Sequence, residues 1–455
     1  MSAESKTDEG GDYRLQGGPW ASAWKLAAGA GVLGLGGWAA GHSSNPQRAA
    51  YSYLFAFLVF LTIGLGSLFF VLVQYLTSAR WSVTVRRTAE FFMVGLLVFA
   101  PLFVPVVLGM EHLYPWTHVS AEHGGGHESA PHEGGHGEHG APAAATEHGG
   151  GHGAGVYSQE DIERAVHHEL LQHKAPYLNR NFWFLRALIY FAAWGLLAWS
   201  FYRNSTAQDG SRAEGLTVRS ARLAPPATFV FGLTLTFAGV DWIMGLDPTW
   251  FSTIFGVQLF SGSVVAAMAV LILTTLSLRA NGPLTRAVTV EHYHDLGKLL
   301  FGFNCFWAYI SFSQFFLIWY AGIPEETTYF HARWGDGPWK NVSLLICLGH
   351  FALPFVFLMS RNIKRRLSLL SLGAAGMLVM HVVECYWAVL PNFARNVLEL
   401  TPQDPASLQP HWLDLACLVG VGGVYLAVVF QRMTRHPLVP IGDPRLSRSL
   451  RFENF

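Results

Sequence analysis

The sequence is poor in charged residues. Only 13% of its 455 residues are charged, about half of the roughly 25% that an ordinary soluble domain carries. Thirty Lys and Arg residues balance thirty Asp and Glu residues, so the formal net charge is zero. This balance excludes a basic nucleic-acid-binding protein and a strongly acidic disordered tail.

The sequence is also poor in cysteine. Its four cysteines stand alone, at Cys305, Cys347, Cys385 and Cys417. None belongs to a CxxC or CxxCH motif, and none has the spacing of a metal site. The sequence therefore gives no support for a covalent c-type haem, a zinc ribbon or a cysteine-ligated iron–sulfur cluster.

Hydrophobic residues, in contrast, make up 51% of the chain and gather in long runs. A transmembrane helix needs about 20 mostly apolar residues to cross a hydrocarbon core of about 30 Å. Ten runs meet or approach this length, and the first, rich in glycine and alanine, is the weakest. They cover residues 24–41, 51–78, 83–109, 180–203, 224–244, 250–279, 296–322, 340–360, 366–390 and 411–431. The sequence thus predicts an all-α polytopic membrane protein of about ten transmembrane helices.

The positions of the positive charges predict how these helices are oriented. With the N-terminus in the cytoplasm, the inner segments hold 22 Lys and Arg residues, the outer segments hold 7, and Arg186 lies within a run. Both termini are therefore expected to be cytoplasmic, as tails over 1–23 and 432–455. The first 20 residues are polar, so we expect an uncleaved signal anchor rather than a signal peptide.

A long outer segment, residues 110–179, separates helices predicted within 24–109 from those within 180–431. Its middle, 122–155, consists mainly of Gly, His, Glu, Ala and Pro and cannot build a core. Seven histidines fall there: His123, His127, His132, His136, His139, His148 and His152. They could bind Zn or Cu adventitiously, or the insert could be a flexible linker. Residues 158–178, after the insert, predict a short amphipathic helix.

Ionisable residues inside the predicted spans are functional candidates, because a charge at mid-membrane costs about 2.5–3.5 kcal/mol. The strongest candidate is the pair His381 and Glu384, whose i, i+3 spacing places both side chains on one helix face. A histidine beside a buried carboxyl group can share a proton with it. The pair could relay protons or, with nearby Tyr386, bind a quinol head group. The alternative is a polar pair that fixes helix packing.

Other candidates lie nearer the middle and the outer surface. His350 lies near the midplane and is either a relay partner of His381 or a packing residue. Asp241 lies near the outer surface and either ends a proton path or caps a helix. A b-type haem between His292 and His294, or between His350 and His381, is a weaker alternative. Its two axial histidines should lie at one depth on two helices, and only His350 and His381 approximate this arrangement. We expect no covalently bound cofactor.

Candidates on the inner side form two groups. Arg86 and Glu90 are spaced i, i+4 and can pair. The second group is a cluster of ionisable residues at the start of the seventh run: Glu291, His292, His294, Asp295 and Lys298. This cluster could collect protons from the cytoplasm, or it could be a solvated helix entry. Together, the inner and outer positions predict two proton half-channels that meet near the midplane.

Three stretches of the sequence resemble a known family. They are residues 241–256, which begin Asp-Trp-Ile-Met-Gly-Leu-Asp-Pro; residues 292–314, which begin His-Tyr-His-Asp-Leu-Gly-Lys; and residues 319–327, which begin Trp-Tyr-Ala. With His381 and the run Glu384–Trp387, they resemble the F subunit of alternative complex III, a quinone-binding subunit by homology. That complex is a bacterial quinol:cytochrome c oxidoreductase, and the subunit is of the polysulfide-reductase type.

The resemblance implies a fold, a location and a set of partners. It implies ten helices, arranged as two four-helix bundles plus an extra pair, in the cytoplasmic (inner) membrane of a bacterium. The implied partners are a homologous ten-helix C subunit, an extracytoplasmic iron–sulfur subunit, pentahaem and monohaem cytochrome c subunits and other small membrane subunits, with a terminal cytochrome oxidase as a potential acceptor. Menaquinone and lipids are the implied ligands.

The resemblance also implies a proton path, through Asp241, the cluster at 292–298, His350, His381 and Glu384. The leading hypothesis is therefore a cofactor-free membrane subunit that transfers protons and binds menaquinol. A structural scaffold subunit of the same complex is the first alternative. A stand-alone secondary transporter is the second, although the sequence has no inverted repeat with paired Gly/Pro-broken helices.

Overall fold

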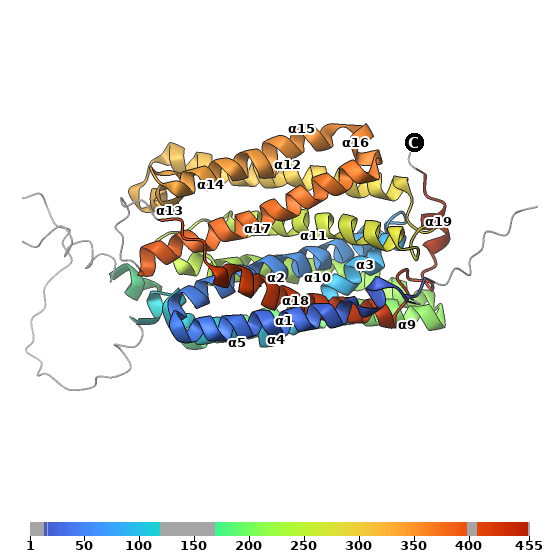
Figure 1. Cartoon of the computed structure of the whole chain (residues 1–455), viewed down its shortest axis with the longest axis horizontal. Helices are drawn as coiled ribbons and strands as arrows, with labels where there is room; N and C mark the ends of the chain where they lie inside the picture. The colour runs from blue at the N-terminus through green and yellow to red at the C-terminus, as the bar shows by residue number, and fades with distance from the viewer. Residues whose placement is uncertain (1–12, 16, 119–168, 398–406, 454–455) are drawn as a thin grey trace, which may run out of the picture.

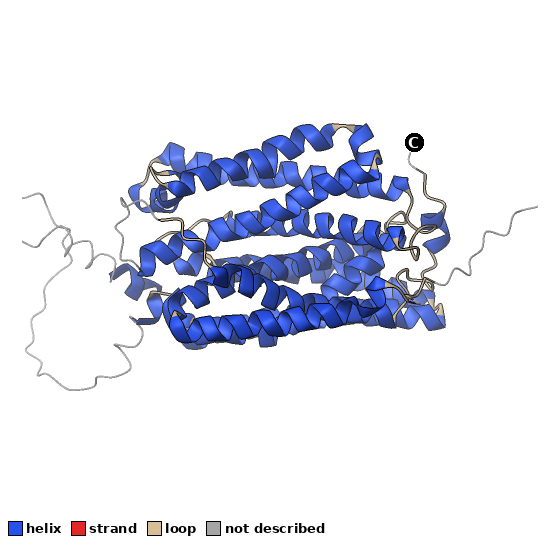
Figure 2. Ribbon diagram, viewed as in Figure 1, coloured by secondary structure: helices blue, strands red, loops and turns tan. Residues whose placement is uncertain are grey.

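The computed structural model describes residues 13–15, 17–118, 169–397 and 407–453. The His-rich insert at 122–155, with the metal-binding alternative for its histidines, lies outside these residues. Most of the amphipathic helix predicted over 158–178 also lies outside them. Within the described residues the chain is helical and has no strand (Figure 2).

Nine helices of the described part are long and apolar enough to cross a membrane. Two of these spans are composite, since short 3-10 or π turns interrupt them: α3 (Val83–Val94) to α5 (Val104–Leu108), and α14 (Pro338–Ile346) to α15 (Leu353–Met359). The others are α2 (Pro46–Leu76), α9 (Arg180–Ser211), α10 (Glu214–Trp242), α11 (Phe255–Ala280), α12 (Val290–Ala321), α17 (Leu367–Val397) and α18 (Trp412–Arg435). The predicted fold class, an all-α polytopic membrane protein, is confirmed.

The first predicted run corresponds to α1 (Pro19–Ser44), which is not among the nine because it is less apolar. Its 26 residues are nevertheless long enough to cross, and it lies along α18 (Figure 1). The backbone N–H of Leu438, after the last span, donates to the carbonyl oxygen of Tyr13, before α1, at 2.9 Å. The segment before the first helix and the segment after the last span therefore lie on the same side of the bundle. This arrangement requires an even number of crossings. Adding α1 to the nine other spans gives ten crossings, so this condition is met.

Contacts between neighbouring helices divide the ten spans into three groups. The spans that start at α2, α3, α9 and α10 form one four-helix bundle, and those that start at α11, α12, α14 and α17 form a second. The first and last spans, α1 and α18, pack together as an extra pair against α2. The two bundles meet where α2 packs on α11 and α17, so α2 and α11 are the most buried spans.

The extra pair is held by close backbone contact between glycines. A Cβ added at Gly31 of α1 would lie 2.7 Å from the amide nitrogen of Val424, and one added at Gly420 of α18 would lie 2.8 Å from that of Leu35. Small residues allow membrane helices to approach each other in this way when no hydrophobic force drives them together. The glycine and alanine content that makes α1 less apolar is thus what fits it to α18.

We expect Gly31→Leu to weaken this contact, because its side chain would have to displace the backbone of α18. Overpacking of this kind costs about 1–3 kcal/mol. The measurement is the thermal unfolding temperature of the purified protein in detergent. Gly36→Leu is the matched control, since nothing lies within 4 Å of a Cβ at Gly36 on the same helix. Equal unfolding temperatures for the two variants would contradict the close contact.

Candidate functional site

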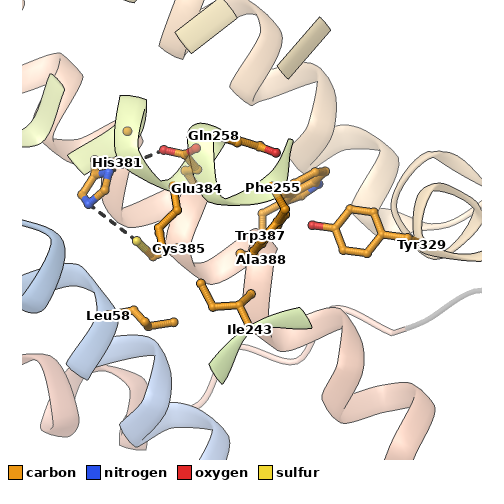
Figure 3. Close-up of a pocket in the computed structure, with 12 residues that line it drawn as sticks. Leu58, Ile243, Phe255, Gln258, Tyr329, His381, Glu384, Cys385, Trp387 and Ala388 are labelled. Atoms are coloured by element: carbon orange, nitrogen blue, oxygen red, sulfur yellow. Dashed lines mark hydrogen bonds and ion pairs between the residues drawn. The ribbon is translucent and has the colours of Figure 1, made fainter. Parts of the chain in front are cut away.

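The pair His381 and Glu384 lies near the midpoint of α17, and the helix places both side chains on one face (Figure 3). The side chain of His381 is 2% exposed and that of Glu384 is 12% exposed. Nδ1 of His381 lies 3.5 Å from Oε2 of Glu384. The structure thus shows the contact that the i, i+3 spacing predicts.

His350 reaches the same carboxylate from another helix. Its Nε2 lies 3.4 Å from Oε2 of Glu384, and the residue is fully buried. It belongs to a π-helical turn, Cys347–Ala352, that interrupts the span between α14 and α15. Pro354 follows this turn and has no N–H to donate to it. Such π turns are frequent at functional sites because they rotate side chains out of the regular helical register.

Thr62 of α2 fixes the orientation of the His381 ring. Its Oγ1 lies 2.8 Å from Nε2 of His381 and also 2.8 Å from the carbonyl oxygen of Leu58. When the hydroxyl hydrogen is donated to this carbonyl, the hydroxyl oxygen can accept from the Nε2–H of His381. Nδ1 is therefore left facing Glu384. These two groups can share one proton, either as imidazolium and carboxylate or as imidazole and carboxylic acid.

Two cavities border this group of side chains. A small one, of about 30 Å³, lies beside His381, Glu384, Gln258 and Gly262, and is large enough for water. A large one, of about 390 Å³, is also lined by Glu384. Its walls include Trp307, Phe312, Phe315, Phe330, Trp334, Phe351 and Trp387. Glu384 lines both cavities, and the large one has the size of a small-molecule site.

Tyr386, the third candidate for a quinone site, is not brought to this pocket. Its hydroxyl lies 3.5 Å from Oδ2 of Asp414, and its ring stacks on Trp339 at a centroid distance of 5.7 Å. Asp414 in turn pairs with Arg48 of α2 at 2.6 Å. Of the three residues His381, Glu384 and Tyr386, Glu384 is the one that lines the large pocket.

Asp241 lies on α10, in the other four-helix bundle, where both of its carboxylate oxygens are occupied. Arg186 of α9 donates from Nε to Oδ2 at 2.8 Å and from Nη2 to Oδ1 at 2.9 Å. The hydroxyl of Tyr190 also donates to Oδ2, at 2.7 Å. A bidentate, buried pair of this kind holds α9 to α10, and the structure does not bring it to Glu384.

The predicted pair Arg86 and Glu90 forms at 3.0 Å, within a larger buried network at the end of the bundle where the C-terminal segment lies. Arg87 also lies 3.0 Å from Glu90. The remaining partners are Asp209 of α9, 2.7 Å from Arg87, and Asp443 of the C-terminal segment, 2.7 Å from Arg86. The network therefore ties α3 to α9 and to the C-terminal segment.

The cluster at the start of α12 is divided among local contacts. Nδ1 of His292 accepts from the backbone N–H of Thr289 at 3.1 Å and so caps the helix. Glu291 pairs with Arg365 at 2.5 Å, and Asp295 pairs with Lys298. The ring of His294 is largely buried. Lys298 lies nine residues before Trp307, about 13 Å along the helix, so no residue of this cluster reaches the site directly.

Two residues that contact the site were not found from the sequence. Thr62 and His381 are 319 positions apart, and Trp307, which donates to Glu384, is 77 positions from it. Threonine and tryptophan are ordinary residues of spanning helices, so neither carries a local signal. The Phe306–Gln314 stretch that supports the family resemblance does contain Trp307.

The geometry argues against a haem between His350 and His381. Nε2 of His350 and Nδ1 of His381 face Oε2 of Glu384, at 3.4 and 3.5 Å. The carboxylate therefore occupies the space between the two histidines that an iron porphyrin would need. Within the described residues, no group of three or more His, Cys, Asp or Glu side chains could hold a metal ion. The contacts at this site join one carboxyl group and two imidazoles.

A comparison of the chain with protein-family models finds no match, and a search of curated proteins finds no similar sequence.

Proposed function

We propose that this chain is a proton-conducting integral membrane subunit of a respiratory quinol:cytochrome c oxidoreductase of the alternative complex III type. The observation that carries the proposal is the carboxylate of Glu384, 12% exposed, whose Oε2 lies within 3.5 Å of a nitrogen of each of two histidines near the midpoint of a spanning helix. Ionisable groups are expensive at this depth and generally mark ion or proton pathways. The motifs in 241–256, 292–314 and 319–327 support the assignment to the complex.

Unpartnered polar atoms next to the site support a hydrated path toward the inner side. Asn304 is fully buried on α12, one turn inward of Trp307, and neither of its amide atoms has a hydrogen-bond partner. Both ring nitrogens of His350 also lack a hydrogen bond. Buried polar atoms are nearly always satisfied by protein or by ordered water. We therefore propose that water molecules connect Asn304 and His350 to the cytoplasmic half.

The assembly proposed for the chain follows from the resemblance. The bacterial inner membrane is the proposed location, and the homologous ten-helix subunit, the iron–sulfur subunit and the two cytochrome c subunits are the proposed partners. Moving one charge against 100 mV costs about 2.3 kcal/mol, which quinol oxidation elsewhere in the complex would supply. The subunit would then take part in energy conservation without a redox cofactor of its own.

A quinol head group in the large pocket is a second candidate function. The pocket is mostly aromatic, has a volume of about 390 Å³ and has one carboxylate, Glu384, at one end. Phe312 and Cys347, on its lining, are exposed at the surface of their helices, so a menaquinol could enter from the bilayer. Glu384, rather than Tyr386, would face its hydroxyl group.

The test is proton release measured together with quinol:cytochrome c turnover in liposomes that contain the intact complex. We expect His381→Ala to lower proton transfer across the membrane, counted beyond the two protons that oxidation of each quinol itself releases, by about 100-fold or more, because positioned proton-transfer groups typically contribute 10²–10⁴-fold to a rate. Turnover should stay close to that of the wild type. His331→Ala is the control, since His331 is exposed on the short helix α13 (Pro324–Trp334).

The other outcomes favour other functions. Turnover lost in His381→Ala, with the complex still assembled, would favour quinol binding at this site. Both activities retained would favour the scaffold hypothesis. If the chain purified without any cytochrome, a stand-alone transporter would be favoured.

A further inference from the structure

One tryptophan contacts two members of the site at once. Nε1–H of Trp307, on α12, donates to Oε1 of Glu384 at 2.6 Å. Its ring also stacks on that of His350, with a centroid distance of 3.9 Å and an interplanar angle of 22°. An indole N–H can only donate, and a hydrogen bond to a carboxylate is stronger than one between neutral groups. Trp307 therefore favours the ionised form of Glu384.

This hydrogen bond gives the two carboxylate oxygens different tasks. Oε1 is held by the indole, whereas Oε2 has no hydrogen bond and lies 3.4 Å from His350 and 3.5 Å from His381. A Cβ on Gly262 of α11 would lie 2.9 Å from Oε2. The absence of a side chain at Gly262 thus leaves room for Oε2, which is the oxygen that can exchange a proton with the imidazoles.

Trp307 also lies between the large pocket and His350. Trp307 and Glu384 both line that pocket, whereas neither His350 nor His381 is among its lining residues. The indole covers one face of the His350 ring. A proton that enters from the pocket therefore meets the carboxyl group before it meets either imidazole.

We infer that Trp307 is a positioning residue that holds the Glu384 carboxylate between the large pocket and the two histidines. A proton then passes from the pocket to the histidines through this carboxyl group. The inference rests on the proposed function. A proton from the pocket forms an O–H bond on Glu384, and that bond breaks when an N–H bond forms on His381 or His350. The carboxylate is then regenerated, and no electron is transferred.

The test is an infrared pH titration of the full chain in proteoliposomes, in which the C=O band of protonated Glu384 is assigned by its loss in Glu384→Gln. Trp307→Phe keeps an aromatic ring beside His350 but removes the donor. A hydrogen bond to a charged group is worth about 1.5–3 kcal/mol, so the pH at which the band is half developed should rise by about 1–2 units. The pH profile of proton release should move in the same direction.

Trp319→Phe is the matched control, because Trp319 lies on the same helix and is 64% exposed. An unshifted band in a folded Trp307→Phe variant would overturn the inference. If that variant does not fold, the test is instead a pH titration of the wild type followed by resonance Raman spectra of its tryptophans. One tryptophan N–H signal should then change over the pH range in which the Glu384 band develops, and it should be altered in Glu384→Gln. The absence of such a signal would also overturn the inference.

These results are distinguishable from a failure of the proposed function. If Glu384→Gln stops proton release while Trp307→Phe behaves like Trp319→Phe, the positioning role is wrong and the function stands. If Glu384→Gln leaves proton release unchanged, the proton-conducting function is wrong and the inference falls with it.

Discussion

Replacing Glu384 by glutamine is expected to lower proton transfer by the complex, beyond the two protons that oxidation of each quinol itself releases, about 100-fold or more while leaving the fold intact. Positioned proton-transfer groups contribute typically 10²–10⁴-fold to a rate, and an amide does not exchange a proton in this way. Glutamine retains an oxygen that can accept from Nε1–H of Trp307, which is 2.6 Å from Oε1 in the wild type. It also has nearly the same volume, so the packing against Gly262 is preserved.

The measurement is proton release in liposomes, with thermal unfolding as the check on folding. Glu111→Gln is the control, because the Glu111 side chain is 59% exposed and its pair with Arg180 lies at the surface. Surface pairs contribute at most about 1 kcal/mol, so this variant should behave as the wild type does. Normal proton release in Glu384→Gln would show that the carboxyl group serves packing alone.

Replacing Glu90 by glutamine is expected to lower the free energy of unfolding by about 3–5 kcal/mol, as breaking a buried ion pair does. Glu90 lies 3.0 Å from both Arg86 and Arg87, and all three side chains are fully buried. Without its charge, Nε of Arg86 and Nε of Arg87 would each lose their carboxylate partner, and Asp443 and Asp209 would remain as one partner each. The repulsion between the two guanidinium groups would then be poorly compensated in a region that water does not reach.

This variant also separates two roles for Glu90, which the sequence offers as a candidate for the proton path. A structural role predicts a lower unfolding midpoint in denaturant titrations, with Glu111→Gln again as the control. A proton-path role predicts lost proton release at unchanged stability. Arg87 and Arg86, which pair with Glu90, also pair with Asp209 of α9 and with Asp443 of the C-terminal segment. These ion pairs join three parts of the chain and so favour the structural role.

The fold was largely predictable because membrane spans follow from a local property. Each span needs a continuous apolar stretch of sufficient length, and backbone groups in lipid must satisfy one another within the helix. Nine of the ten predicted runs correspond to helices that are long and apolar enough to cross. The tenth, α1, is less apolar, since its glycines serve the contact with α18. Hydropathy alone does not reveal that contact.

The sequence by itself determined the membrane class, the spans and the pair His381 and Glu384, because an i, i+3 spacing fixes two side chains on one helix face whatever surrounds them. The tertiary structure decided which other groups reach that pair. His350 arrives through a π turn, Trp307 through α12 and Thr62 through α2. It also decided that Asp241 pairs with Arg186. Such contacts depend on how each helix is rotated about its axis against its neighbours, and no local pattern in the chain specifies that rotation.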